Sequence, residues 1–197
     1  MRDEKKQIRH EVITNAAYNM LAAKGYDGAS MLSIAKAAKA SNETLYRWYG
    51  DKRGLFEAMV CDNAEDIKII LEKAVVREDE PSETLRHVAP LLLTMLLGER
   101  AILLNRAAAA DPSGELGAAI AAGGRDVIQP LIAKLIRTVC GDNGADVREL
   151  ADRFLGLLIG DLQIRRVIGV LNAPTKAEIE VRSKNALDVF FKLIQHQ

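Results

Sequence analysis

The sequence predicts an all-α protein, and three observations support this fold class. Only five prolines and fourteen glycines interrupt 197 residues, so long stretches carry no helix breaker. Apolar residues make up 49% of the chain, which is enough to fill a core. They recur at helical spacing, as at Ile8, Val12, Ala16 and Met20, and no comparable run alternates with the two-residue period of a strand.

The breaks between these patterns define the expected helices in chain order. Gly25 follows the first apolar pattern, and polar connectors at residues 76–83, 111–115 and 140–146 separate the later ones. We expect helices at residues 6–24, 31–38, 42–49, 52–76, 82–97 and 99–109, then a broken helical segment at 115–139, and long helices at 146–171 and 176–195.

The charge is unevenly distributed along a chain whose net charge is zero. Residues 1–53 carry ten basic and six acidic side chains, and the remaining residues carry an acidic excess of four. A basic first quarter on an acidic body is typical of a small nucleic-acid module joined to a domain that does not bind nucleic acid. An excess of this size also occurs as ordinary surface variation, so charge alone leaves both interpretations open.

Two short helical patterns between residues 30 and 49 have helix-turn-helix spacing. Ser30 can cap the first helix, and Ser41 can cap the second. Glu43 lies in the first turn of the second helix, where the helix dipole favours an acidic side chain. Leu45 and Tyr49, four residues apart, supply its buried stripe.

The outer face of that second helix carries side chains suited to DNA. Hydroxyl, amide, guanidinium and aromatic groups can bind phosphates, base edges and thymine methyls. They belong to Asn42, Thr44, Tyr46, Arg47 and Trp48.

The segment GYDGASMLSIAKAAKASNETLYRWYGDKRGLFEAMV resembles the N-terminal DNA-binding domain of TetR-type transcriptional regulators over roughly residues 8–60. The elements that match in order and spacing are Gly25-Tyr26, Ser30-Met31, Ile34-Ala35, Ala38, Ser41, Thr44-Leu45-Tyr46, Lys52 and Leu55. Five positions depart from the family pattern, and one of them is Ala40, which replaces the usual apolar valine. Lys39 stands at a turn position where the family prefers glycine, so a positive φ would strain it. Glu43 also replaces a frequent glycine, and Trp48-Tyr49 replace a frequent His-Phe pair.

The resemblance implies that residues 42–46 enter the major groove of double-stranded DNA. Thr44 and Tyr46 would contact phosphates or bases, Ser41 would begin the helix, and Lys52 would bind a phosphate at the start of the next helix. Arg47 is added because of its charge and exposed position. Trp48 fits either a DNA contact or the core, whereas Tyr49 fits the core.

The resemblance also implies two domains, a helix-turn-helix domain at residues 1–53 and an effector-binding and dimerisation domain at 54–197. The last two helices would pair with those of a second copy in a homodimer, and the body, which looks like the AefR-like subgroup, would hold a small-molecule pocket. Asp161 and Arg165 are expected to form an internal ion pair. The candidate pocket residues, apolar with a few polar anchors, are Leu92, Met95, Leu96, Ile102, Asn105, Arg106 and Phe154.

Other function classes lack their motifs. The chain has no phosphate-binding glycine loop and no nucleophile elbow, and His10-Glu11 lacks the second histidine of a zinc-protease motif, so no enzyme activity, cofactor or metal is expected. Cys61 and Cys140 lie too far apart for a metal-binding pair.

The charged N-terminus and short apolar stretches predict a cytoplasmic protein without a membrane span. A homodimeric repressor that a small molecule releases from a pseudo-palindromic operator is therefore expected; the alternative is a helical interaction or thiol-sensing protein without sequence-specific DNA binding.

Overall fold

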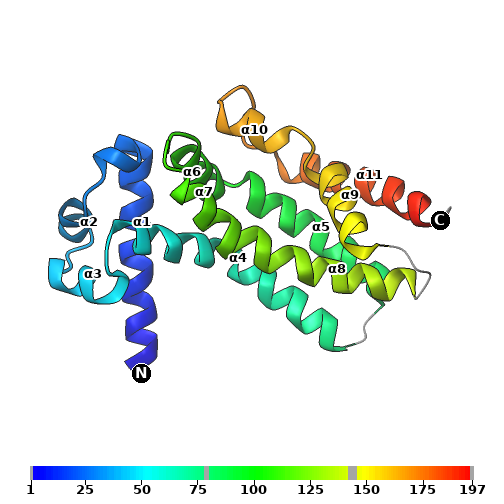
Figure 1. The fold of residues 1–197 in the computed structure, drawn as a ribbon, viewed down its shortest axis with the longest axis horizontal. Coiled ribbons are helices and arrows are strands. Elements are labelled where there is room, and N and C mark those ends of the chain that lie inside the picture. Colours follow the sequence, from blue (N-terminus) through cyan, green and yellow to red (C-terminus); the bar gives the residue numbers. More distant parts are fainter. Residues whose placement is uncertain (1, 78–79, 142–145, 196–197) are drawn as a thin grey trace.

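A computed structural model describes residues 2–77, 80–141 and 146–195, and every regular element in these ranges is helical (Figure 1). This confirms the all-helical prediction of a helix-turn-helix followed by a helical C-terminal domain. The elements are α1 (Arg2–Gly28), α2 (Met31–Ala37), α3 (Asn42–Tyr49), α4 (Lys52–Arg77), α5 (Pro81–Leu97), α6 (Glu99–Ala109), α7 (Glu115–Ile120), the π-helical segment η1 (Ala121–Arg125), α8 (Asp126–Cys140), α9 (Val147–Ile159), α10 (Leu162–Val167) and α11 (Lys176–Gln195).

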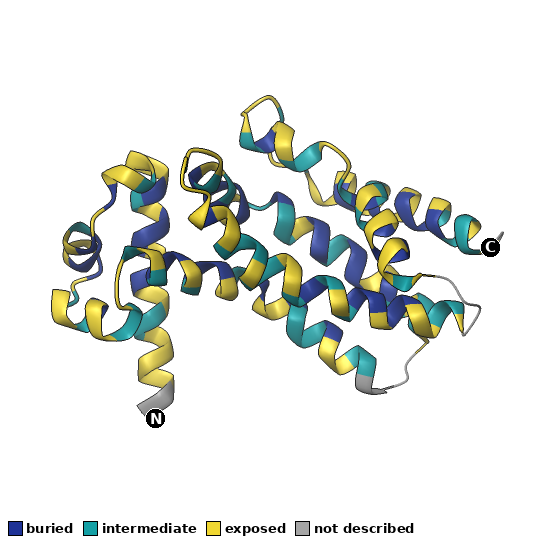
Figure 2. Ribbon diagram, viewed as in Figure 1, coloured by how far each residue is buried: buried dark blue, intermediate teal, exposed yellow. Residues whose placement is uncertain are grey.

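The helices form a small N-terminal group and a larger body, and α4 runs from one into the other. In Figure 1, α1, α2 and α3 lie together at one end. In the body, α5 and α8 run beside α4. Helices α9 and α11 pack on α8 and α5. Figure 2 shows the buried stripes of these helices turned toward one another. The two ends of the described chain lie at opposite ends of the molecule.

Two apolar cores divide the molecule, and α4 contributes to both. Leu55, Phe56 and Met59 pack in the first core with α1, α2, α3 and the last turns of α6. Ile67 and Leu71, further along α4, pack in the second core with α5, α8, α9 and α11. A displacement of α4 would therefore disturb the packing of both cores.

The predicted helix at residues 146–171 is wrong, because the chain breaks at Gly160. Gly160 has a φ of 52°, and its N–H donates to the Gly156 carbonyl, which closes the end of α9. Arg182 of α11 donates to the carbonyls of Leu157 and Leu158 at 2.6 and 2.9 Å. A side chain from another helix thus satisfies carbonyls that a continuing helix would have used.

The broken segment that the sequence predicts at residues 115–139 is present as α7, η1 and α8. The π-helical turn at its centre lies against α4, where a Cβ on Gly123 would come within 3.0 Å of Val60 Cγ1 and 3.2 Å of Cys61 Sγ. A larger residue at this position would push the segment away from α4. Glycine therefore allows the close approach of η1 to α4.

Candidate DNA-binding surface and effector cavity

Local capping fixes the two helices of the helix-turn-helix. Ser30 Oγ accepts from the Ser33 N–H, and Ser33 Oγ accepts from the Ser30 N–H, both at 3.1 Å, in a reciprocal capping box. Ser41 Oγ accepts from the Thr44 N–H at 3.1 Å and caps α3. Both helices therefore begin where the sequence places them.

The outer face of α3 presents three of the predicted DNA-binding side chains to solvent. Asn42 and Arg47 are exposed, and Tyr46 is 49% exposed. None of the three hydrogen-bonds another side chain within the described part of the chain, so their polar groups remain available to a partner.

Three further predicted residues have contacts within the protein. The Thr44 hydroxyl lies 2.7 Å from Ser41 Oγ, so both hydroxyls take part in the cap. Trp48 is half-buried against the first core, its ring 6.3 Å from that of Tyr49, and Lys6 Nζ lies 5.9 Å from its ring. Part of the Trp48 side chain therefore packs against the first core, and the rest of it is exposed.

Lys52 is held beneath the α1–α2 connection. Its Nζ donates to the carbonyls of Tyr26 at 2.9 Å and Ala29 at 3.2 Å, and it lies 4.1 Å from the centre of the Tyr26 ring. An ammonium has three donors, so one remains for a phosphate. The sequence predicted the phosphate contact but gave no sign of these two bonds.

The turn between α2 and α3 contains the strained lysine that the sequence predicts. Lys39 has a φ of 50°, the single positive φ of a non-glycine residue within the described ranges. Arg9 of α1 donates to the carbonyls of Ala38 at 3.5 Å and Lys39 at 2.6 Å. These bonds hold the turn in place and compensate part of its strain.

Lys39→Gly is expected to raise the free energy of unfolding by about 0.5–1 kcal/mol. A left-handed conformation costs a residue with a Cβ about 1–2 kcal/mol, and the greater backbone entropy of unfolded glycine offsets part of the gain. The Arg9 bond survives because it uses the backbone carbonyl of residue 39. Urea unfolding monitored by circular dichroism measures the change. Lys39→Ala keeps the Cβ and serves as control; equal stability of the two variants would contradict the strain argument.

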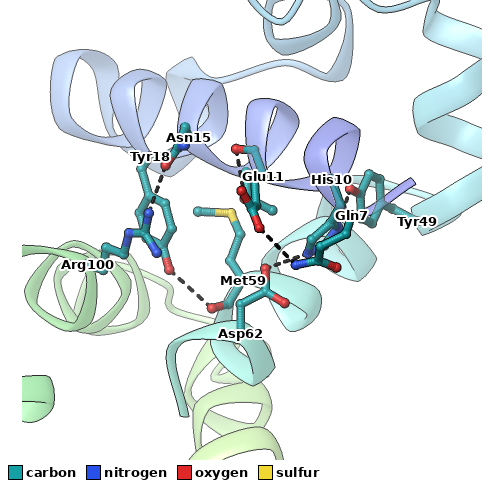
Figure 3. Close-up of polar contacts among 10 residues, drawn as sticks. Gln7, His10, Glu11, Asn15, Tyr18, Tyr49, Met59, Asp62 and Arg100 are labelled. Atoms are coloured by element: carbon teal, nitrogen blue, oxygen red, sulfur yellow. Dashed lines mark hydrogen bonds and ion pairs between the residues drawn. The ribbon is translucent and has the colours of Figure 1, made fainter. Parts of the chain in front are cut away.

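A hydrogen-bonded brace joins the end of α3 to α1 and α4 (Figure 3). His10 Nδ1 lies 2.8 Å from the Tyr49 hydroxyl, and His10 Nε2 lies 2.6 Å from Asp62 Oδ2. Burial, with a smaller contribution from Asp62, raises the pKa of Tyr49 to about 12, so its hydroxyl keeps its proton at neutral pH. The Tyr49 hydroxyl can then donate to His10 Nδ1 while the His10 Nε2–H donates to Asp62. Both ring nitrogens of His10 therefore have a hydrogen-bond partner.

Two further contacts fasten α1 to the body (Figure 3). The Tyr18 hydroxyl donates to the Met59 carbonyl of α4 at 3.1 Å, and burial raises the pKa of Tyr18. Arg100 of α6 donates to Asn15 Oδ1 at 2.8 Å and lies over the Tyr18 ring. The position of α1, and with it the helix-turn-helix, therefore depends on α4 and α6.

The body holds a cavity of about 530 Å³ between α4, α5, α6, α7, η1, α8, α9 and the start of α10. This volume is within the range of small-molecule sites. Most lining side chains are apolar. The polar ones come from six of these elements and are Asn63, Asn105, Arg125, Gln129, Asp152 and Gln163.

Four of the seven predicted pocket residues line this cavity: Leu92, Met95, Leu96 and Asn105. The other three assignments are wrong for this cavity. Phe154 is wholly buried against Phe190 in the second core, and Ile102 is 1% exposed away from the cavity. Arg106 instead donates to the carbonyls of Val167 and Arg166.

Sequence reasoning missed the α4 wall of the cavity, formed by Val60, Asn63 and Ala64, and its α8–α9 wall with Gln129 and Asp152. Asn63 and Gln129 are polar residues within largely apolar helical stripes, and this was the available signal. The predicted Asp161–Arg165 ion pair is present at 3.8 Å, and its side chains are 70% and 44% exposed, so the pair lies at the surface and not in the interior.

The thiols, histidines and acidic residues form no further site among the residues that the structure describes. No group of three or more side chains there could hold a metal ion. Burial, together with Asp62, Glu65 and Glu57, raises the pKa of Cys61, and burial raises that of Cys140. Both thiols therefore lack the lowered pKa of a reactive cysteine.

No single helix in residues 2–77, 80–141 and 146–195 is long and apolar enough to cross a membrane. The pair α5 and α6, bent by 52° at Gly98, passes the test of length and composition only when taken together.

Comparison with known proteins places this architecture. Residues 13–59 match the family described as bacterial regulatory proteins, tetR family. A TetR-family transcriptional regulator from Mesorhizobium loti shares the fold with a TM-score of 0.76 and 26% identity, over 95% of this chain and 96% of the other. A TetR transcriptional regulator from Agrobacterium tumefaciens gives a TM-score of 0.72 and 28% identity, over 94% and 93%. The chain belongs to the TetR family.

The curated relative YdeS, an uncharacterized HTH-type transcriptional regulator of Bacillus subtilis, is 35% identical over 57 residues. The match spans 29% of the length of each protein. TetR-family proteins are transcription factors and not enzymes, in agreement with the motifs missing from the sequence. For this TetR-family chain, the capped helices α2 and α3 form the helix-turn-helix, and the cavity lies in the C-terminal body.

Proposed function

We propose that this TetR-family protein is a homodimeric, ligand-responsive repressor that binds a pseudo-palindromic operator through α3 and is released by a small molecule. One observation carries the proposal: α4 contributes to the core beneath the helix-turn-helix and also to the wall of the cavity. The DNA-binding part is proposed to comprise residues 1–53, and the effector-binding and dimerisation part residues 54–197.

The DNA contact would be made by the N-terminal end and outer face of α3 in the major groove. Asn42, Tyr46 and Arg47 are exposed there. Thr44 and Ser41 would contribute hydroxyls at the start of the helix, next to backbone N–H groups that favour phosphate. Trp48 would contact DNA with the half of its surface that remains free.

The homodimer would form through α10 and α11. Large apolar side chains are exposed on these elements and on the connection between them: Ile164 at 55%, Ile168 at 63%, Val170 at 65%, Val181 at 60% and Val189 at 49%. Apolar surface of this kind favours association with a second copy. A two-fold dimer would present two α3 helices to successive major grooves, about 34 Å apart.

Ile168→Asp is expected to weaken dimerisation at least about 100-fold, because a charge buried without a partner costs several kcal/mol. Sedimentation velocity over a concentration series measures the dissociation constant. Ile8→Asp alters a similarly exposed isoleucine (57%) on α1 and is expected to leave the dimer unchanged. A dimer unaffected by the Ile168 change would contradict the assignment of this interface.

The release step would act through α4. A ligand that favours one position of the α4 wall shifts the population of conformations by its difference in affinity for them. The brace formed by Asp62, His10 and Tyr49 would carry a movement of α4 to the end of α3. The two α3 helices of the dimer would then no longer match the fixed spacing of the two operator half-sites, and the dimer would leave the operator.

Selection of bound duplexes from a random DNA pool tests the proposal. A pseudo-palindrome is the expected result, and Tyr46→Ala should bind the selected duplex at least about 10-fold more weakly, because a side chain on the DNA-facing surface typically contributes 1–3 kcal/mol. Failure to enrich any sequence with protein freed of bound ligand would contradict DNA recognition and favour a helical interaction protein.

Lys52→Ala is expected to lower the slope of log affinity against log salt by about one unit, because one phosphate contact releases about one counterion. Titration of the selected duplex over a salt series measures the slope, at a temperature where the variant is folded. Lys24→Ala removes an exposed lysine from the end of α1 and should leave the slope unchanged. An unchanged slope for the Lys52 variant would mean that this lysine only holds the α1–α2 connection.

A further inference from the structure

The charges of the cavity restrict the class of ligand it can accept. Arg125 and Asp152 are the two ionisable side chains among its described lining residues, and they pair with each other at 3.0 Å. Their side chains are 65% and 51% exposed, which places the pair at the mouth of the cavity. The interior therefore has no unpaired cation for an anionic ligand.

Three of the four amides of the wall have orientations fixed by carbonyl or carboxylate partners, and the fourth, Asn63, donates from Nδ2 to Met95 Sδ at 3.2 Å. Asn105 Nδ2 donates to the Ala101 carbonyl at 2.8 Å, and Gln163 Nε2 donates to the Leu96 carbonyl at 3.1 Å. Gln129 Nε2 donates to Asp152 Oδ1 at 2.6 Å. These partners can only accept, so a flipped amide would place oxygen against oxygen.

The amide oxygens are consequently left without a donor. Within the described chain no N–H or O–H reaches Asn105 Oδ1, Gln163 Oε1 or Gln129 Oε1. Half-buried oxygens of this kind need a donor from water or ligand. Apart from Asn63 and the Arg125–Asp152 pair, the rest of the wall is apolar, with Leu92, Leu155 and Ile128 among its members.

We infer that the cavity takes an uncharged, mainly apolar molecule that carries a hydroxyl or N–H donor, and that it rejects a carboxylate of the same size. This inference rests on the proposed role of the cavity as the effector site. A donor group would satisfy the free amide oxygens, and the apolar body would fill the remaining wall. A carboxylate would be desolvated without a free cation and would face the same oxygens.

Three matched probes test the inference at neutral pH: naphthol, which donates through its hydroxyl, methoxynaphthalene, which has no donor, and naphthoate, which is anionic. Isothermal titration calorimetry on the full chain without DNA gives the affinities. Naphthol is expected to bind at least about 10-fold more tightly than naphthoate and several-fold more tightly than methoxynaphthalene, since one hydrogen bond contributes about 0.5–1.5 kcal/mol, which is up to about 10-fold.

Two variants, each with a matched control, test where the probes bind and how the cavity distinguishes their charge. Gly156→Leu should abolish naphthol binding, because Gly156 lines the cavity and an added Cβ meets open space there. Ala22→Leu on the exposed face of α1 is its control and should bind normally. Asp152→Asn frees Arg125 from a charged partner and should narrow the preference for naphthol over naphthoate. Asp126→Asn makes the same charge change outside the cavity and should leave that preference unchanged.

The outcomes separate the two proposals. Naphthoate binding as tightly as naphthol overturns the ligand class and leaves the cavity as the effector site. Binding of none of the probes, or binding that Gly156→Leu does not alter, overturns both the ligand class and the effector role of this cavity. DNA binding through α3 is measured separately and is affected by neither result.

Discussion

Phe154→Ala is expected to lower the free energy of unfolding by about 3–5 kcal/mol, the largest loss predicted for this chain. Phe154 is wholly buried, and its ring lies 5.3 Å from that of Phe190, with Leu150, Leu158 and Leu187 in the same core. Alanine would leave a void that the surrounding helices can fill only in part. Urea unfolding at fixed protein concentration measures the loss.

Phe191→Ala is the matched control for this prediction. Phe191 is half-buried at the edge of the same core, with the Arg86 guanidinium 4.8 Å from its ring centre. Phe191→Ala should lower the free energy of unfolding by less than about 2 kcal/mol, because less apolar surface is lost from the core than at Phe154. Equal losses for the two phenylalanines would contradict the assignment of Phe154 to the core and return it to the candidate pocket residues.

Arg166→Met is expected to lower the free energy of unfolding by about 2–3 kcal/mol. Arg166 is buried, and its guanidinium donates to the carbonyls of Leu97 and Leu171 and to Glu99. Methionine preserves much of the side-chain length but leaves the buried Leu97 carbonyl without this donor, and an unsatisfied buried group costs about 1–3 kcal/mol. Thermal and urea unfolding both report the change.

The neighbouring arginine provides the control. Arg165 is 44% exposed and pairs with Asp161 alone among the described residues, so Arg165→Met should change stability by no more than about 0.5–1 kcal/mol. Similar losses for the two variants would show that the buried bonds of Arg166 do not hold α10 to the α5–α6 corner.

The helix-turn-helix could be predicted closely from the sequence because its signals are local. Ser30 and Ser41 cap helices that begin one residue later, and α3 covers the expected residues 42–49. The strained turn at Lys39 was also predicted, since its position in the motif determines its φ. Motif and capping patterns extend over a few residues and need no knowledge of distant packing.

The cavity and the end of α9 could not be predicted in the same way. The break at Gly160 depends on Arg182, which lies more than twenty residues further along the chain. Phe154 and Asn63 both lie on apolar helices, and only the packing of neighbouring helices decides that the first enters the core and the second the cavity. The two carbonyl partners of Lys52 likewise come from the distant end of α1 and from the α1–α2 connection.

A competition titration tests the central claim, sequence-specific DNA binding, most directly. A labelled duplex carrying the selected pseudo-palindrome is titrated with ligand-free protein at physiological salt, with a scrambled duplex of equal length as competitor. The account predicts a dissociation constant of about 10⁻⁸ M or tighter and at least about a 1,000-fold preference for the selected duplex. Equal competition by the scrambled duplex would contradict it.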